Sequence, residues 1–150
     1  MKLKNNAWRF TNEFYSDVEK FNIEMIKYQK DIYETAKNWK PNEIVFDFPE
    51  LEIQYMAWVK AATDLLENES LIESDKDVFD EESEEEGHQV EILARLKAEN
   101  GKNFSALEFL MKTHNQMWNK ELGDHVFFEG TKQSREIIDG ITTCFISCGS

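Results

Sequence analysis

The sequence predicts an α+β protein with two N-terminal helices, followed by a small mixed sheet of three or four strands with one further helix packed on it. Three observations predict this class. Apolar residues recur at helical spacing in the first part of the chain, alternate from Val90 to Ala98, and form a β-branched and aromatic run at residues 141–148. With 150 residues, 41% of them hydrophobic, the chain is expected to form a single domain over residues 1–150 with its own core.

The first helix is expected over about residues 12–38. Thr11 or Ser16 is expected to cap its start, and Pro41 prevents it from continuing. The apolar stripe recurs at steps of three and four residues: Phe14, Val18, Phe21, Met25, Tyr28, Ile32 and Ala36.

Residues 43–48, EIVFDF, form a short β-prone run that fits either an edge strand or an extended connection. Pro49 then suits the first turn of a second helix. The apolar residues of that helix repeat at steps of four and three: Leu51, Tyr55, Trp58, Ala62 and Leu65.

Apolar and mostly polar residues alternate at 89–98, which predicts a half-buried strand. Asn100-Gly101 suits the turn after it. The third helix is expected from Ala106 to about Leu122, because Ser105 and Glu108 have capping-box spacing. Within its apolar stripe, a lone histidine, His114, is expected to be buried and hydrogen-bonded.

The C-terminal part is expected to contain strands at residues 125–129 and 141–148, joined by a loop at 131–140. If the third helix connects the strand at 89–98 to the strand at 125–129 by a right-handed parallel crossover, the sheet is mixed.

The strongest clue to function is residues 73–86, ESDKDVFDEESEEE, with nine carboxylates and one lysine in a chain of formal charge −13. Such a run repels nucleic acid and anionic lipid, which carry dense negative charge. It attracts a basic protein and raises the rate of encounter. The alternative is a solvated flexible loop. We expect an acidic surface loop at about residues 70–88.

Catalytic and metal-binding signatures are weak. Asp124, His125 and Glu129 suggest acid/base chemistry or a metal site, but in a strand His125 and Glu129 stand about 13 Å apart. Cys144 next to His125 would suggest a thiol nucleophile, yet Cys144 and Cys148 fit neither a redox nor a zinc pattern and are expected to be free, buried thiols. We therefore expect no enzyme, no metal and no cofactor.

No stretch approaches the roughly 20 apolar residues of a membrane span, and the start lacks the apolar centre of a secretory signal. A cytoplasmic protein is expected.

The segments HQVEILARLKA, ENGK, FSALEFLMKTHNQMW and LGDHVFFEG lie within residues 88–130. Together they resemble immunity proteins of bacterial contact-dependent growth inhibition systems, specifically those paired with ribonuclease toxins. The resemblance implies a toxin inhibitor that acts by protein–protein interaction. Such a protein binds the cognate toxin's C-terminal domain and occludes its active site or RNA-binding surface.

A ribonuclease holds phosphates with Lys and Arg, so an acidic inhibitor can compete for the same surface. The acidic run is therefore the expected toxin-binding surface, with Glu43, Asp47 and Glu50 as an alternative. The residues expected to bind the toxin are Asp75, Asp77, Asp80, Glu81, Glu82, Glu84, Glu85 and Glu86.

Two other functional classes stay open. One is an acidic nucleic-acid mimic or adaptor that binds a basic DNA- or RNA-binding protein. The other is a small hydrolase that uses Asp124, His125 and Glu129.

Overall fold

The computed structural model describes residues 2–80 and 87–150, apart from the side chain of Arg135. Its helices and strands follow one another along the chain as β1 Trp8–Arg9, α1 Val18–Tyr33, β2 Ile44–Phe46, β3 Glu50–Val59, β4 Glu69–Leu71, β5 His88–Lys97, β6 Phe104–Ser105, α2 Ala106–Met117, β7 Phe127–Ile138 and β8 Ile141–Gly149. Three short 3-10 turns lie between β3 and β5: η1 Ala62–Asp64, η2 Glu73–Asp75 and η3 Val78–Asp80.

The described strands form a six-stranded sheet in the order β1-β7-β8-β3-β5-β4, with β2 and β6 as a separate pair. The predicted architecture, with a small sheet of three or four strands, is therefore wrong. The sheet is mixed because β3 and β8 are parallel while its other pairs are antiparallel. The predicted parallel connection from β5 through the third helix to β7 is confirmed, because β5 and β7 run in the same direction, although β3 and β8 lie between them in the sheet.

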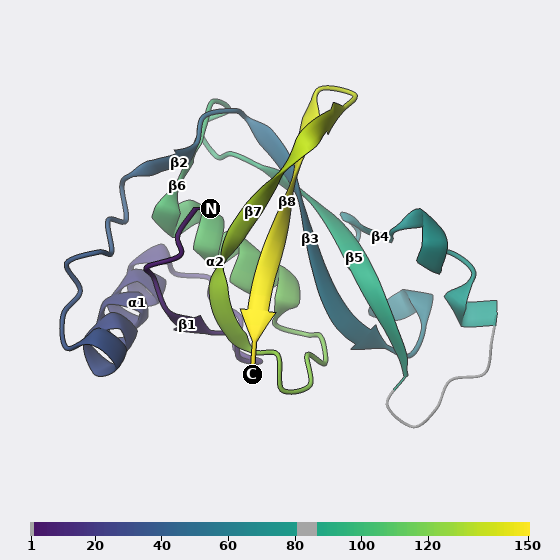
Figure 1. Ribbon diagram of the computed structural model, residues 1–150, viewed down its shortest axis with the longest axis horizontal. Coiled ribbons are helices and arrows are strands. Elements are labelled where there is room, and N and C mark those ends of the chain that lie inside the picture. The colour runs from purple at the N-terminus through teal and green to yellow at the C-terminus, as the bar shows by residue number, and fades with distance from the viewer. Residues whose placement is uncertain (1, 81–86) are drawn as a thin grey trace.

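Helix α2 lies behind β7 and β8 in Figure 1, and α1 lies to the left, where it packs against α2 and β1. Phe21 and Met25 of α1 and Phe109 and Leu110 of α2 are fully buried. The core lies between the helices and the inward-facing side chains of the central strands. On β3 and β5 these are Leu51, Ile53, Tyr55, Ala57, Val59, Val90, Ile92, Ala94 and Leu96.

The second predicted helix is instead strand β3. Burial alternates at every residue from Glu50 to Val59, and β3 pairs with β5 along its full length. The sequence ELEIQYMAWV fits both periods, because its odd-numbered residues are apolar and two of its even-numbered residues, Met56 and Trp58, are apolar too. β-branched and aromatic side chains favour the strand over the helix, and pairing with β5 stabilises the strand.

Helix α1 is shorter than predicted. It begins after Asp17, whose carboxylate accepts the backbone N–H groups of Glu19 and Lys20 at 2.9 and 3.4 Å. Neither predicted cap is used. The helix ends at Tyr33, because Glu34 has a left-handed backbone with φ 65°.

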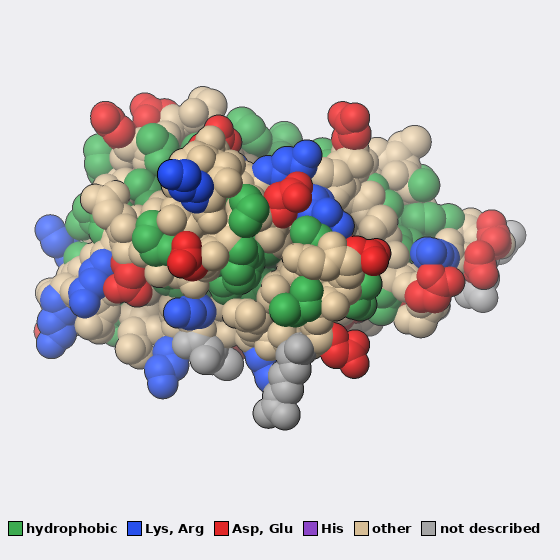
Figure 2. All heavy atoms as spheres, turned by 90° about the horizontal axis from the view of Figure 1, so that it is seen from above, with side chains coloured by type: hydrophobic (Ala, Val, Ile, Leu, Met, Phe, Trp, Pro, Cys, Tyr) green, Lys and Arg blue, Asp and Glu red, His purple; other side chains and the backbone are tan. Residues whose placement is uncertain are grey.

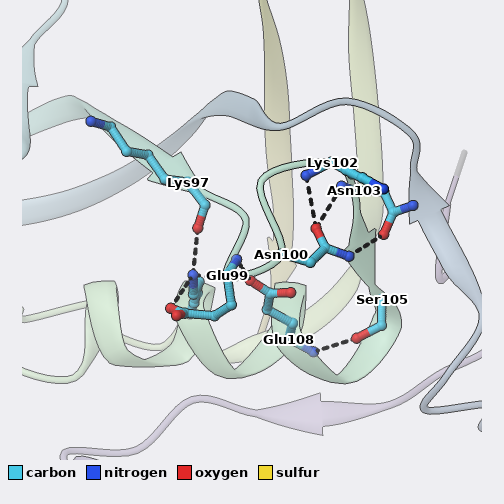
Figure 3. A network of polar contacts seen from close by, with 8 residues as sticks. Lys97, Glu99, Asn100, Lys102, Asn103, Ser105 and Glu108 are labelled. Carbon is cyan, nitrogen blue, oxygen red and sulfur yellow. Dashed lines mark hydrogen bonds and ion pairs between the residues drawn. The ribbon is translucent and has the colours of Figure 1, made fainter.

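The predicted strand at 89–98 is confirmed as β5, and the predicted third helix forms but ends five residues early, at Met117. Ser105 caps α2 by accepting the N–H of Glu108 at 3.1 Å. The Glu108 carboxylate does not complete a capping box. It accepts the N–H of Glu99 at 2.8 Å and pairs with Lys112 at 3.0 Å, which ties the turn after β5 to α2 (Figure 3).

Residues 131–140 do not form the predicted loop. Strand β7 continues to Ile138 and turns into β8 through Asp139 and Gly140, which both have positive φ, at 53° and 77°. A two-residue turn of this kind matches the twist of a β-hairpin. The predicted strand at 125–129 is thus the start of a twelve-residue strand that begins at Phe127.

Candidate functional site

The acidic surface emerges from the end of the β3–β5 pair. These strands pair from Glu50↔Lys97 to Val59↔His88, so the chain between them leaves and rejoins the pair at one end, and β4 within it lies along the edge of β5. We call residues 64–86 the acidic excursion. It holds 12 of the 30 acidic residues and one of the 17 basic residues, Lys76. The other 127 residues are nearly balanced, with 18 acidic and 16 basic side chains.

This charge is separated along the longest axis of the molecule. The described part of the acidic excursion lies at the right end in Figure 1, and α1 lies towards the left end. Residues 1–40, which include α1, hold eight basic and six acidic residues. Figure 2 shows basic side chains along the left with acidic ones among them, and acidic side chains grouped at the right tip beside a basic one. The molecule is therefore electrically polar as well as acidic.

A buried ion pair fastens the acidic excursion to the domain. The Lys120 ammonium lies 2.8 Å from the Glu69 carboxylate, and both side chains have 0% exposure. Lys120 also donates to Asn119 Oδ1 at 2.8 Å. Glu69 lies on β4 and Lys120 follows α2, so the pair joins the edge of the sheet to the end of a helix. Removing one partner would leave an uncompensated buried charge.

Tyr55 extends this anchor into β3. Its hydroxyl donates to Glu69 Oε2 at 2.5 Å. Burial raises the pKa of Tyr55 above its usual value, and the Glu69 carboxylate raises it further. Asn68 and Gln116 exchange two amide hydrogen bonds at 2.9 and 3.0 Å alongside. The anchor could not be predicted from the sequence, because Glu69 and Lys120 are far apart along the chain.

The predicted toxin-binding residues fall into three groups. Asp75 has a structural role, since its carboxylate accepts the N–H of Glu91 on β5 at 2.9 Å. Asp77 and Asp80 are exposed around η3. The remaining five lie outside the described residues: Glu81, Glu82, Glu84, Glu85 and Glu86.

Apolar contacts pack the described part of the acidic excursion against the core. Val78 and Phe79 are half-buried and pack against the core. The Phe79 ring meets His88 edge-on at 5.8 Å between centroids. Asp77 and Asp80 are therefore exposed on a segment that packs against the domain.

The residues that suggested catalysis are only partly brought together. The His125 ring nitrogen Nδ1 lies 2.9 Å from the Asp124 carboxylate, and both side chains are exposed. Glu129 lies instead against β8, where its carboxylate helps to raise the pKa of Cys148. Within residues 2–80 and 87–150, no three His, Cys, Asp or Glu side chains gather in a way that could hold a metal ion.

His114 is buried and hydrogen-bonded, as predicted. Its Nδ1 accepts from Trp8 Nε1–H at 3.1 Å, and its Nε2 lies 2.6 Å from the Glu13 carbonyl oxygen. Those bonds identify the neutral ring with its proton on Nε2, which donates to Glu13. Burial lowers the pKa of His114 below 6.5. His114 therefore joins β1 and the start of α1 to α2.

Both cysteines are free thiols, as predicted, although Cys148 is only half-buried. Burial raises the pKa of each thiol to about 12. Because the thiolate is the reactive form, iodoacetamide at pH 8 should alkylate the folded protein at least about 100-fold more slowly than the protein in urea. Mass spectrometry over time measures both rates, and equal rates would contradict the burial of the thiols.

No known protein family, characterised protein or solved structure matches the chain. Across the described residues, no helix is long and apolar enough to cross a membrane.

Proposed function

We propose that the protein is a cytoplasmic immunity protein that binds and neutralises a cognate, basic ribonuclease toxin domain. The observation that carries the proposal is the charge distribution, since 12 of the 30 acidic residues belong to residues 64–86 and the described part of this segment lies at one end of a nearly balanced domain. The resemblance of residues 88–130 to immunity proteins of contact-dependent growth inhibition systems supplies the class of partner.

The physical basis is competition for a phosphate-binding surface. A ribonuclease holds its substrate backbone with Lys and Arg, so its active surface is positively charged. A concentrated acidic end attracts that surface and orients the inhibitor during approach, which raises the association rate. Once bound, the inhibitor covers the RNA-binding surface and excludes the substrate. No turnover is required of the inhibitor.

The anchor supports this role. A flexible acidic loop loses conformational entropy when it binds, whereas a segment already fixed to the domain loses less. Glu69 and Lys120 fix β4, and Asp75 and Phe79 fix the turns that follow it. Asp77 and Asp80 are thus presented from a supported segment.

Capture from the native host tests the class of partner. The tagged full-length protein should retain one basic toxin domain encoded beside it, and its co-expression should restore growth to cells that produce this toxin. Recovery of an unrelated basic DNA- or RNA-binding protein, with no protection from the toxin, would replace this proposal with the nucleic-acid mimic.

The exposed carboxylates of the acidic excursion are expected to speed association with the toxin. Neutralising three exposed carboxylates of the excursion, with Glu67→Gln, Asp77→Asn and Asp80→Asn, should slow association with the toxin about tenfold at low salt. Stopped-flow measurements from 20 to 300 mM salt should also show a weaker salt dependence. Asp75 is left unchanged because it supports β5.

A matched control removes the same charge from exposed positions of α1 and its C-cap, with Glu19→Gln, Asp31→Asn and Glu34→Gln. This variant has the same net charge as the first but keeps the acidic excursion. Its association rate should stay within about twofold of the wild type. If both variants slow association equally, overall charge and not the excursion drives the encounter.

A further inference from the structure

A cavity of about 560 Å³ opens beside the root of the acidic excursion. Its walls come from the end of β3, from the η1 turn and from the segment after α2. The residues that matter for its chemistry are Trp58, Lys60, Asp64, Asn119, Glu121 and Gly123.

The walls are held by backbone contacts. Trp58 N–H donates to the Glu121 carbonyl oxygen at 2.8 Å, which joins β3 to the segment after α2. Gly123 has φ 63°, and a Cβ atom there would stand 3.1 Å from the Trp58 ring. The half-buried Trp58 indole therefore lies directly against Gly123. A larger residue at position 123 would displace the indole.

Two carboxylates face the cavity with part of their hydrogen-bonding capacity in use. Asp64 Oδ2 accepts the N–H groups of Lys60 and Ala61 at 3.0 and 3.2 Å. Glu121 Oε1 accepts the N–H of Gly123 at 2.9 Å. Within the described residues, Asp64 accepts hydrogen bonds through Oδ2 and Glu121 accepts one through Oε1. The other oxygen of each carboxylate, Asp64 Oδ1 and Glu121 Oε2, remains as an acceptor for a ligand.

Lys120 also borders the cavity, but its ammonium is buried and neutralised by Glu69. The charges left at the mouth are two carboxylates and the exposed Lys60, next to a strongly acidic segment. A cation is therefore the favoured ligand. Because Trp58, Asp64 and Glu121 line the same cavity, a guanidinium suits it, since this group stacks on aromatic rings and donates several hydrogen bonds in a plane.

We propose that this cavity is the subsite for an arginine side chain of the basic partner, held between Trp58 and the carboxylates of Asp64 and Glu121. The identity of the partner rests on the proposed function, whereas the arginine subsite does not. Arginine and tryptophan are the residues that most often dominate binding energy at protein interfaces. The exposed carboxylates of the acidic excursion beyond Asp64 set the rate of encounter, and this subsite, which includes Asp64, sets the lifetime of the complex.

The first test uses the full-length protein alone with the peptide acetyl-Gly-Arg-Gly-amide. Its matched control is the same peptide with citrulline, which has nearly the shape of arginine without the charge. The indole N–H signal of Trp58, assigned by its loss in Trp58→Phe, should shift in NMR spectra with the arginine peptide only. Equal shifts with both peptides, or no shift at 20 mM, would overturn the subsite.

Variants then test the named carboxylates. Asp64→Asn with Glu121→Gln should weaken binding of the arginine peptide about tenfold, because each change keeps an oxygen for the local N–H bonds and removes the charge. Glu19→Gln with Asp31→Asn, which removes two charges from α1, should leave binding unchanged. Lys60→Gln should tighten binding. An equal loss in the carboxylate and α1 variants would contradict a specific subsite.

A captured partner separates this inference from the proposed function. The Asp64→Asn and Glu121→Gln double variant should raise the dissociation rate of the complex about tenfold with little change in association. If the wild-type protein captures no basic toxin while the peptide results hold, the proposed function fails and the arginine subsite stands. If capture succeeds and both rates are unchanged, the subsite fails alone.

Discussion

Replacing Lys120 with methionine is expected to lower the free energy of unfolding by about 3–5 kcal/mol. The Glu69 side chain has 0% exposure and lies 2.8 Å from the Lys120 ammonium. Without that ammonium, a carboxylate stays buried with only the Tyr55 hydroxyl and the Leu66 N–H as donors among the described residues. Urea unfolding followed by circular dichroism measures the loss.

Two controls interpret the result. Lys20→Met removes an ammonium whose partner, Glu13, is exposed, and it should change stability little. Glu69→Leu combined with Lys120→Met removes both charges and should recover part of the loss, because no uncompensated charge stays buried. A loss below about 1 kcal/mol in Lys120→Met would show that the ion pair does not hold the fold.

Replacing His114 with alanine should cost about 3–5 kcal/mol, as for other large buried rings. The His114 ring lies within 6.0 Å, between centroids, of the rings of Trp8, Phe10, Tyr15 and Phe21. Its loss leaves a cavity among them. It also leaves the Trp8 Nε1–H and the Glu13 carbonyl without their partner. Urea unfolding at pH 7.5 measures the change.

The pH dependence of stability gives His114 a second and more specific test. Burial lowers its pKa in the folded protein below the usual 6.5, so the unfolded chain binds a proton that the folded chain does not. The contribution of His114 is therefore complete above about pH 6.5 and is lost as the pH falls, by at most about 1.4 kcal/mol per pH unit.

Comparing unfolding at pH 7.5, 6.5 and 5.5 isolates this contribution. The wild-type protein should lose more stability than His114→Ala over this range. Identical slopes in the wild-type and His114→Ala proteins would contradict the neutral, buried ring.

Local signals in the sequence predicted β5 and α2 well. On β5, every second residue from Val90 to Leu96 is buried, so alternation in the sequence matches burial in the fold. On α2, Ser105 supplies the predicted N-cap. In both cases the pattern is set by neighbours within one element, which a single sequence can display.

The sequence failed where partners distant along the chain decide the structure. Strand β3 carries a pattern that fits a helix, and its strand form depends on pairing with β5 and β8. The long β7 is likewise stabilised by β8 across a turn of Asp139 and Gly140. Polar residues at 131–136 resemble a loop until that pairing is known.

Of the candidate site, only the concentration of negative charge could be predicted from the sequence. The density of carboxylates at residues 73–86 is plain in the sequence, and exposed Asp77 and Asp80 agree with a surface position. The anchor of Glu69 and Lys120 was not predictable, because these two residues meet only through the packing of β4 beside α2. The cavity next to Trp58 likewise depends on a contact with Glu121 across the chain.

The position of β8 constrains when the protein can fold during synthesis. β8 spans Ile141–Gly149 and lies between β7 and β3, so it alone joins the β1–β7 half of the described sheet to the β3–β5–β4 half. A ribosome covers the most recently added residues, and the sheet cannot close until residue 149 has emerged. Domains made of such distant pairings fold slowly. The two halves of the described sheet therefore join only after β8 has been synthesised.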